Sequence, residues 1–212
     1  MPAQKAGNKP TSLGPHEEGE VNKSSSNLKQ QKISDSSKAN NKKGFPVNDE
    51  EANKILNQSL KEQQVMLVAK KQELEKWDSN SQANFKTWFG TTNESDKKII
   101  EQRIDKTLDM SKNYDVDKFR PAPPKYKDAY AVVNPDDKEH HINLGEPFWS
   151  APTKGSDTKA GVLSHEMSHF NEIGGTDDYA YGLDDSKELA KINPKKALNN
   201  ADNFEFYLEN AK

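Results

Sequence analysis

The sequence predicts an α+β fold with a helical N-terminal half, a small antiparallel β-hairpin and a later helix that carries two histidines. Apolar residues recur at helical spacing through the first half of the chain. Two short apolar runs then flank a turn-rich segment at 134–137, which is typical of a hairpin. Only 31% of the 212 residues are hydrophobic and the mean hydropathy is -1.10, so part of the chain has too little apolar surface to fold.

Residues 1–45 are predicted to be that part, a disordered leader rich in Lys, Ser and Asn. The leader holds eight Lys against four Asp or Glu, so the remaining chain is net acidic. A segment with so few large apolar side chains cannot offset the entropy of ordering its backbone. Because its lysines are dispersed and no aromatic residue lies between them, we expect a solvated leader and no nucleic-acid partner. One folded domain then spans 46–212.

Three helices are expected in the first half of this domain. Asn48 and Glu51 form a capping pair at the start of a long amphipathic helix. A shorter helix capped by Ser79 should end at Gly90, and a third should begin near Ser95. Their apolar stripes are interpreted as core and are given no catalytic role.

Prolines end the helical half, and the hairpin follows. Its strands are expected at 130–133 and 141–144. Residues 145–157 are predicted to be a loop that leads to the next helix, which Ser156 or Asp157 would cap.

The segment 161–182 concentrates the chemistry of the chain. On a helix, His165 and His169 project from one face, one turn apart, as two imidazoles that share a metal ion must. Glu166 lies beside the first histidine, where its carboxylate reaches a water molecule at the metal without displacing it. Two glycines then break the helix and turn the chain back, so that a following acidic side chain can become the third ligand. The pattern indicates a zinc peptidase.

The order His-Glu-x-x-His-Phe, then Gly-Thr-x-Asp-x-x-Tyr-Gly, resembles that of the aspzincins, which comprise deuterolysins and peptidyl-Lys metalloendopeptidases. The resemblance implies a zincin-like metalloprotease fold with an HExxH active-site helix and one zinc ion per chain. It implies Asp178, nine residues after His169, as the third zinc ligand. It also implies Tyr181 as the residue that stabilises the oxyanion, whereas Asp177 falls on a variable position of the motif.

The resemblance extends to the C-terminal helix, which Asn200 is predicted to cap after a loop at 183–194. The segment Ala201-Asp202-Asn203-Phe204-Glu205 is similar to the family segment whose acidic pair lines the pocket for a substrate lysine. It implies Asp202 and Glu205 as substrate-binding residues and cleavage on the N-terminal side of lysine. The alternative is an ordinary helix with acidic residues near the positive end of its dipole.

These features predict a zinc-dependent endopeptidase that acts on peptides or proteins, with Glu166 as general base and the hairpin as the edge that receives an extended substrate. Broader deuterolysin-type specificity stays open. Two other classes compete, namely a zinc hydrolase of cell-wall (peptidoglycan) peptides and a zinc-binding protein without turnover. The presence of Glu166 and Tyr181, which only catalysis needs, argues against the last. A chance pair of helical histidines would require the second motif to be coincidence.

The location of the protein is predicted from what the sequence lacks. It has no apolar signal region at its N-terminus, no segment approaching the ~20 apolar residues that span a bilayer, and no cysteine. Secreted aspzincins usually carry disulfides, so the last feature departs from the family and fits synthesis in a reducing cytoplasm. We expect no membrane insertion. We expect secretion by a signal-peptide-independent route, as a bacterial toxin or effector with a cognate inhibitor or immunity protein, or else a cytoplasmic protein.

Overall fold

The computed structural model describes residues 43–210. The predicted leader at 1–45 therefore lies outside the described residues, apart from its last three. Of these, Phe45 is buried in the core and its ring packs against Trp149, with the ring centroids 4.8 Å apart.

Three helices form the N-terminal half, as predicted. They are α1 (Asp49–Lys76), α2 (Ser79–Phe89) and α3 (Glu94–Lys112). The Asn48 side chain accepts a hydrogen bond from the Glu51 amide and so caps α1. The second helix ends at Gly90, whose φ of 69° is the left-handed conformation that glycine adopts without strain. Its cap is Asp78, which accepts from the Ser81 amide, and not Ser79 as predicted.

The predicted hairpin is confirmed, but it belongs to a mixed sheet of three strands. The strands are β1 (Phe119–Pro121), β2 (Ala131–Val133) and β3 (Ile142–Leu144), in the order β1-β3-β2. The hairpin strands β2 and β3 are antiparallel, whereas β1 pairs with β3 in parallel. The strand β1 was not predicted, because proline usually ends a strand. Pro121 is tolerated at the end of an edge strand, and the next amide, of Ala122, donates to the Leu144 carbonyl instead. Two short 3-10 turns, Val116–Lys118 and Pro124–Tyr126, flank β1.

Five helices make up the rest of the described chain. They are α4 (Glu146–Ser150), α5 (Lys159–His169), α6 (Leu183–Ile192), α7 (Pro194–Ala197) and α8 (Ala201–Glu209). The predictions of loops at 145–157 and 183–194 were therefore wrong in part. Pro147 lies in the first turn of α4, where its missing amide hydrogen costs nothing. The mostly polar α6 is held by packing against α2, so closely that a Cβ on Gly90 would lie 1.8 Å from the Ala190 carbonyl oxygen.

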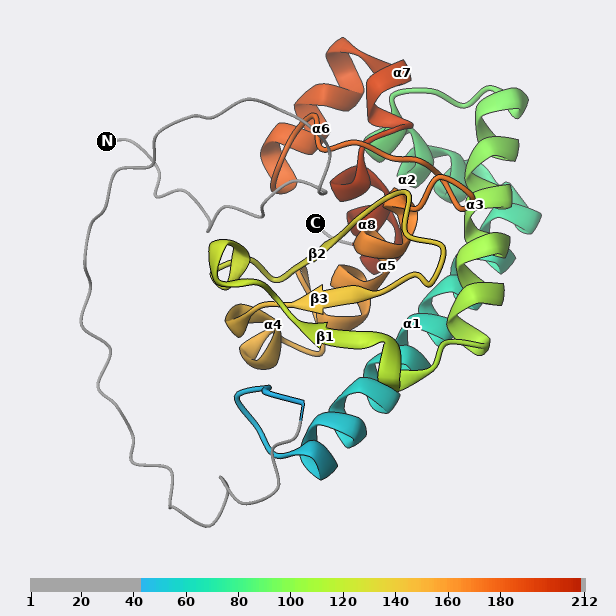
Figure 1. Cartoon of the computed structure of the whole chain (residues 1–212). Helices are drawn as coiled ribbons and strands as arrows, with labels where there is room; N and C mark the ends of the chain where they lie inside the picture. The colour runs from blue at the N-terminus through green and yellow to red at the C-terminus, as the bar shows by residue number, and fades with distance from the viewer. Residues whose placement is uncertain (1–42, 211–212) are drawn as a thin grey trace.

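The centre of the molecule is the packed pair α5 and α8, with α1 and α3 along one side and the sheet along another (Figure 1). One cluster of buried apolar side chains joins α5 to the sheet and the first half of α1, and a second joins α8 to α2, α3 and the second half of α1. Every residue of α5 is buried. Its polar side chains therefore need partners inside the protein.

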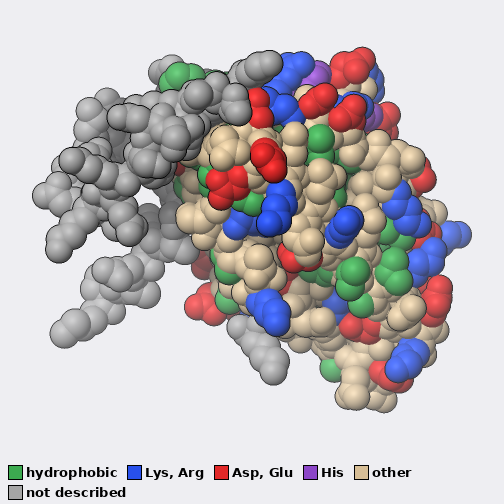
Figure 2. All heavy atoms as spheres, turned by 90° about the horizontal axis from the view of Figure 1, so that it is seen from below, with side chains coloured by type: hydrophobic (Ala, Val, Ile, Leu, Met, Phe, Trp, Pro, Cys, Tyr) green, Lys and Arg blue, Asp and Glu red, His purple; other side chains and the backbone are tan. Residues whose placement is uncertain are grey.

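The described residues present a mixed surface on the face shown in Figure 2. Figure 2 shows Lys and Arg interspersed with Asp and Glu on one face, with apolar side chains scattered among them. The large apolar side chains that are most exposed among the described residues, Val65 and Ile192, lie far apart in the sequence. None of the described helices has the length and apolar character needed to cross a bilayer.

Candidate metal centre

The helix α5 begins with a cap that ties it to α8. The hydroxyl of Thr158 accepts from the Gly161 amide at 2.9 Å, so the cap is Thr158 and not Ser156 or Asp157 as predicted. From α8, Glu209 accepts from both the amide and the hydroxyl of Thr158, each at 2.8 Å. A carboxylate here also complements the positive end of the helix dipole. A Cβ on Gly161 would lie 2.0 Å from Glu209 Oε1, so glycine is what allows α8 to approach this closely.

The structure brings together the three predicted zinc ligands. The Nε2 atoms of His165 and His169 lie 3.3 and 3.5 Å from Asp178 Oδ1, and all three side chains are at most 1% exposed. A tetrahedral zinc ion with bonds of about 2.0–2.2 Å holds neighbouring ligand atoms roughly 3.3–3.5 Å apart. The separations therefore fit one zinc ion bound by these three side chains.

The hydrogen bonding around the ligands supports the same conclusion. His169 Nε2 and both carboxylate oxygens of Asp178 are buried, and they form no well-aligned hydrogen bond with any residue between 43 and 210, although His165 and Tyr181 lie close to Asp178. Buried polar atoms without partners are rare because their desolvation is not compensated. A metal ion would supply the missing interaction for these atoms.

The electrostatics of the ligands also suit a cation. Burial, with a further effect from His165, lowers the pKa of His169 to about 4, so its imidazole is neutral at neutral pH, as a metal ligand must be. Burial alone would raise the pKa of Asp178, but contact with His165 and attraction to both histidines lower it below the usual value. Two neutral imidazoles and one carboxylate form a donor set typical of zinc.

Both imidazoles are oriented through their other nitrogen. His169 Nδ1 donates to the Thr176 carbonyl at 2.7 Å, and the Thr176 hydroxyl in turn contacts that of Ser168 at 2.6 Å. His165 Nδ1 lies 3.0 Å from Asp202 Oδ1 and 3.1 Å from Glu205 Oε2. Such contacts fix the ring orientation and leave each Nε2 directed at the metal position.

Asp202 and Glu205, the predicted substrate-binding residues, both lie against His165. Both side chains are almost fully buried, at 1% and 0% exposed, against the far side of the His165 ring. The second oxygen of Asp202 accepts from the Gly182 amide at 2.7 Å. The sequence did not show these contacts because they follow from the close packing of α8 on α5.

The two predicted catalytic residues lie at the same site. Glu166 is 4% exposed and follows His165 on α5. The Tyr181 hydroxyl is buried beside Asp178 and forms no well-aligned hydrogen bond among the described residues. Burial and the nearby carboxylates of Asp178, Asp202 and Glu166 raise the pKa of Tyr181 above its usual value, so the hydroxyl remains a hydrogen-bond donor.

Asn200, predicted to cap the C-terminal helix, has a different role in the structure. Asn200 precedes α8 as predicted, but its side chain forms no capping hydrogen bond. It binds the backbone of Tyr179 and Ala180 instead, in the loop that carries Asp178 and Tyr181. In the sequence, an asparagine that caps a helix cannot be distinguished from one that binds a neighbouring loop.

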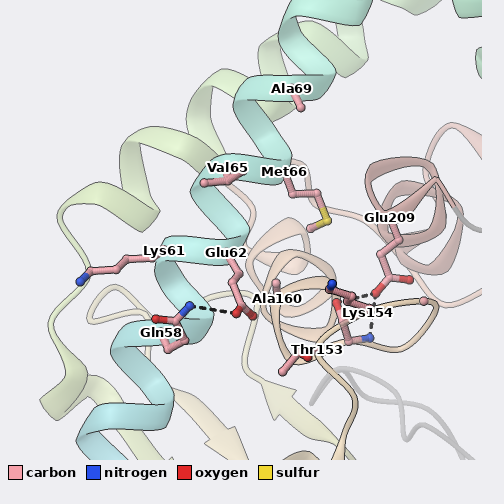
Figure 3. Close-up of a pocket in the computed structure, with 12 residues that line it drawn as sticks. Gln58, Lys61, Glu62, Val65, Met66, Ala69, Thr153, Lys154, Ala160 and Glu209 are labelled. Carbon is pink, nitrogen blue, oxygen red and sulfur yellow. Dashed lines mark hydrogen bonds between the residues drawn. The ribbon is translucent and has the colours of Figure 1, made fainter.

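A separate hollow of about 470 Å³ lies between α1 and the start of α5 (Figure 3). It is lined by Gln58, Lys61, Glu62, Val65, Met66, Ala69, Thr153, Lys154, Gly155, Thr158, Ala160 and Glu209. None of the predicted site residues lines it, so we assign it no part in the chemistry.

Comparison with known proteins agrees with the geometry. The family model of the aspzincins (M35), described as lysine-specific metallo-endopeptidase, matches residues 74–209. The chain belongs to the aspzincin family. An extracellular protease of Aeromonas hydrophila is 36% identical over 133 residues, which are 63% of this chain and 37% of that protein. A peptidyl-Lys metalloendopeptidase of Grifola frondosa is 40% identical over 130 residues, 59% of this chain and 35% of the relative. The chain thus spans little more than a third of either relative.

The similarity extends to the fold of a solved structure. The zinc peptidase from Grifola frondosa superposes with a TM-score of 0.66 and 31% identity, covering 77% of this chain and 97% of that one. The predicted family is therefore confirmed, as is a helical fold with a small sheet. The prediction of zinc as the cofactor agrees with the zinc peptidase of this comparison and with the fit of the ligand cluster.

Proposed function

We propose that this chain is a zinc-dependent endopeptidase that binds one zinc ion through His165, His169 and Asp178. The observation that carries the proposal is the buried cluster of these three side chains, whose separations suit a tetrahedral ion and whose ligand atoms all lie within 4.8 Å of one another. Membership of the aspzincins supports it, because that family is described as metallo-endopeptidases.

Zinc bound at this cluster would act as a Lewis acid toward a water molecule and the scissile carbonyl. Glu166, next to His165 on the active-site helix α5, is the proposed general base. Its carboxylate accepts the proton of the attacking water and passes it to the leaving amine. Tyr181 remains protonated and donates a hydrogen bond to the oxyanion that forms on the carbonyl.

The strand β2 is the proposed binding edge for the substrate backbone. It lies at one edge of the sheet and packs beside α5. An extended peptide that pairs with a sheet edge is held by backbone hydrogen bonds, which suits a peptidase that accepts many sequences.

We further propose a preference for lysine on the C-terminal side of the cleaved bond. The family description and the name of the Grifola relative support lysine as the preferred residue. Asp202 and Glu205 are the proposed source of the preference, because two buried carboxylates against one imidazole create a negative region near the metal position. Export from the cell is proposed from the extracellular Aeromonas relative. A toxin or effector role with an inhibitor protein stays a prediction from the sequence.

Digestion of a proteome-derived peptide library tests this function. We expect new N-termini that begin with lysine, and we expect a chelator to abolish them. Cleavage of muropeptides but not of the library would favour the cell-wall hydrolase. A full zinc content without any hydrolysis would favour the zinc-binding protein without turnover.

A further inference from the structure

The loop that carries Asp178 and Tyr181 is fastened at both ends to the start of α8. Before Asp178, the carbonyl of Asp177 accepts from the Ala201 amide at 3.0 Å, within a parallel bridge. After Tyr181, the amide of Gly182 donates to Asp202 Oδ2 at 2.7 Å. The peptide units between these two points determine where the third zinc ligand and the tyrosine hydroxyl lie.

A single side chain, that of Asn200, holds those peptide units. Its Oδ1 accepts from the amides of Tyr179 and Ala180 at 2.7 and 3.1 Å. Its Nδ2 donates to the Ala180 carbonyl at 3.0 Å. The side chain is fully buried, so no water competes for these bonds.

The orientation of the Asn200 amide is dictated from the opposite side by Asn203. The Nδ2 of Asn203 donates to the carbonyls of Trp88, on α2, and Ser186, on α6. Its Oδ1 must therefore accept, and it does so from Asn200 Nδ2 at 2.8 Å. With Nδ2 committed to Asn203, the oxygen of Asn200 has to face the loop. Helices α2, α6 and α8 thus jointly orient one amide group.

We propose that Asn200 is a positioning residue for the zinc site, acting through the 179–180 backbone to set Asp178 and Tyr181 against the two histidines. The inference rests on the proposed function. Helix capping does not account for these bonds, since the Asn200 side chain forms no capping hydrogen bond. Groups that orient metal ligands matter for binding, because their mutation typically costs about 10- to 100-fold in metal affinity or activity.

The substitution Asn200→Asp keeps the size of the side chain but replaces its donor by an oxygen. That oxygen would face two acceptors, the Ala180 carbonyl and Asn203 Oδ1, so the loop should shift. We expect zinc affinity, measured by competition with a chromophoric chelator, to fall about 10- to 100-fold, and kcat to fall with little change in KM. The matched control is Asn199→Asp. The side-chain amide of Asn199 forms a long bond of 3.4 Å to the Gly175 carbonyl and interacts with the side chain of Tyr179, which is exposed. Neither contact holds the 179–180 backbone, so both quantities should stay at the wild-type value.

A second variant, Asn200→Ser, keeps a hydrogen-bond acceptor at this position. It allows the same measurements if Asn200→Asp does not fold. Thermal unfolding of the zinc-free proteins separates positioning from a purely structural role. A well-folded variant with wild-type zinc affinity and kcat would overturn the proposal, and so would a loss of stability without a loss of affinity. If the wild-type protein binds zinc but cleaves no peptide, the proposed function is refuted. The proposal for Asn200 is still tested in that case by the zinc affinities of the variants.

Discussion

Replacing Asp202 by asparagine tests whether its carboxylate orients the metal site, recognises a substrate lysine, or does both. One oxygen lies 3.0 Å from His165 Nδ1, and the other accepts from the Gly182 amide at 2.7 Å. Asparagine has one oxygen for these two donors, so one contact must be lost and an NH2 group must take its place. The substitution preserves the volume of the side chain, and its effect is therefore electrostatic.

The size of the effect follows from the contact that is lost. A hydrogen bond to a charged group contributes about 1.5–3 kcal/mol, which corresponds to roughly 10- to 150-fold in an equilibrium or rate constant. Because the lost contact orients His165 or the Tyr181 loop, Asp202→Asn should weaken zinc binding and lower kcat/KM by about this factor on every peptide. If Asp202 also attracts lysine, a lysine peptide should lose more than a neutral one.

Two peptides that differ only in lysine or norleucine after the cleaved bond provide the assay. We expect kcat/KM to fall for both, with the larger fall for lysine. The loss shared by both peptides measures the orientation of the site, and the extra loss measures lysine recognition. Wild-type zinc affinity together with normal cleavage of the norleucine peptide would refute the role of Asp202 in orienting His165.

Three further outcomes follow from the site. Tyr181→Phe should keep its zinc while kcat falls on the order of 10² to 10³ with KM nearly unchanged; a normal kcat would make Tyr181 structural. Gly161→Ala places a Cβ 2.0 Å from Glu209 Oε1 and should lower the free energy of unfolding by about 1–3 kcal/mol in denaturant titrations, whereas an unchanged midpoint would contradict the close packing of α8 on α5. Because burial holds the pKa of His169 at about 4, below the unfolded value of 6.5, the unfolded chain binds more protons between these values. The zinc-free protein should therefore lose stability as the pH falls from about 6.5 to 4, and His169→Asn should flatten that part of the melting profile.

The sequence alone allowed the helical half, the hairpin and the histidine helix to be predicted, because each has a local and periodic signal. The helix α1 shows a capping pair and a long apolar stripe, and the turn at 134–137 separates two apolar runs. The strand β1 and the helix α6 have no comparable signal. The first is three residues long and ends in proline, and the second depends on packing against α2.

The residues of the candidate site also fall into two groups: those with a local sequence signal and those that depend on packing between helices. The spacing of His165 and His169 is a property of one helix, and Asp178 and Tyr181 follow from a motif close by in the chain. The contact between Asp202 and His165 depends on the close approach of α8 to α5, which Gly161 on α5 permits. The role of Asn200 was hidden because a helix cap and a loop anchor both call for asparagine.

Zinc content of a matched set of variants tests the central claim most directly. Elemental analysis of purified protein should find about one zinc per chain in the wild type, in Glu166→Gln and in Asp177→Asn, and little in Asp178→Asn. The adjacent Asp177 is the control for the ligand position, since its carboxylate accepts from the Tyr179 hydroxyl at 2.6 Å and does not belong to the cluster of His165, His169 and Asp178. Glu166→Gln should hydrolyse no peptide although it keeps the metal. Zinc retained by Asp178→Asn and lost by Asp177→Asn, or a wild-type protein that binds no zinc, would contradict the account.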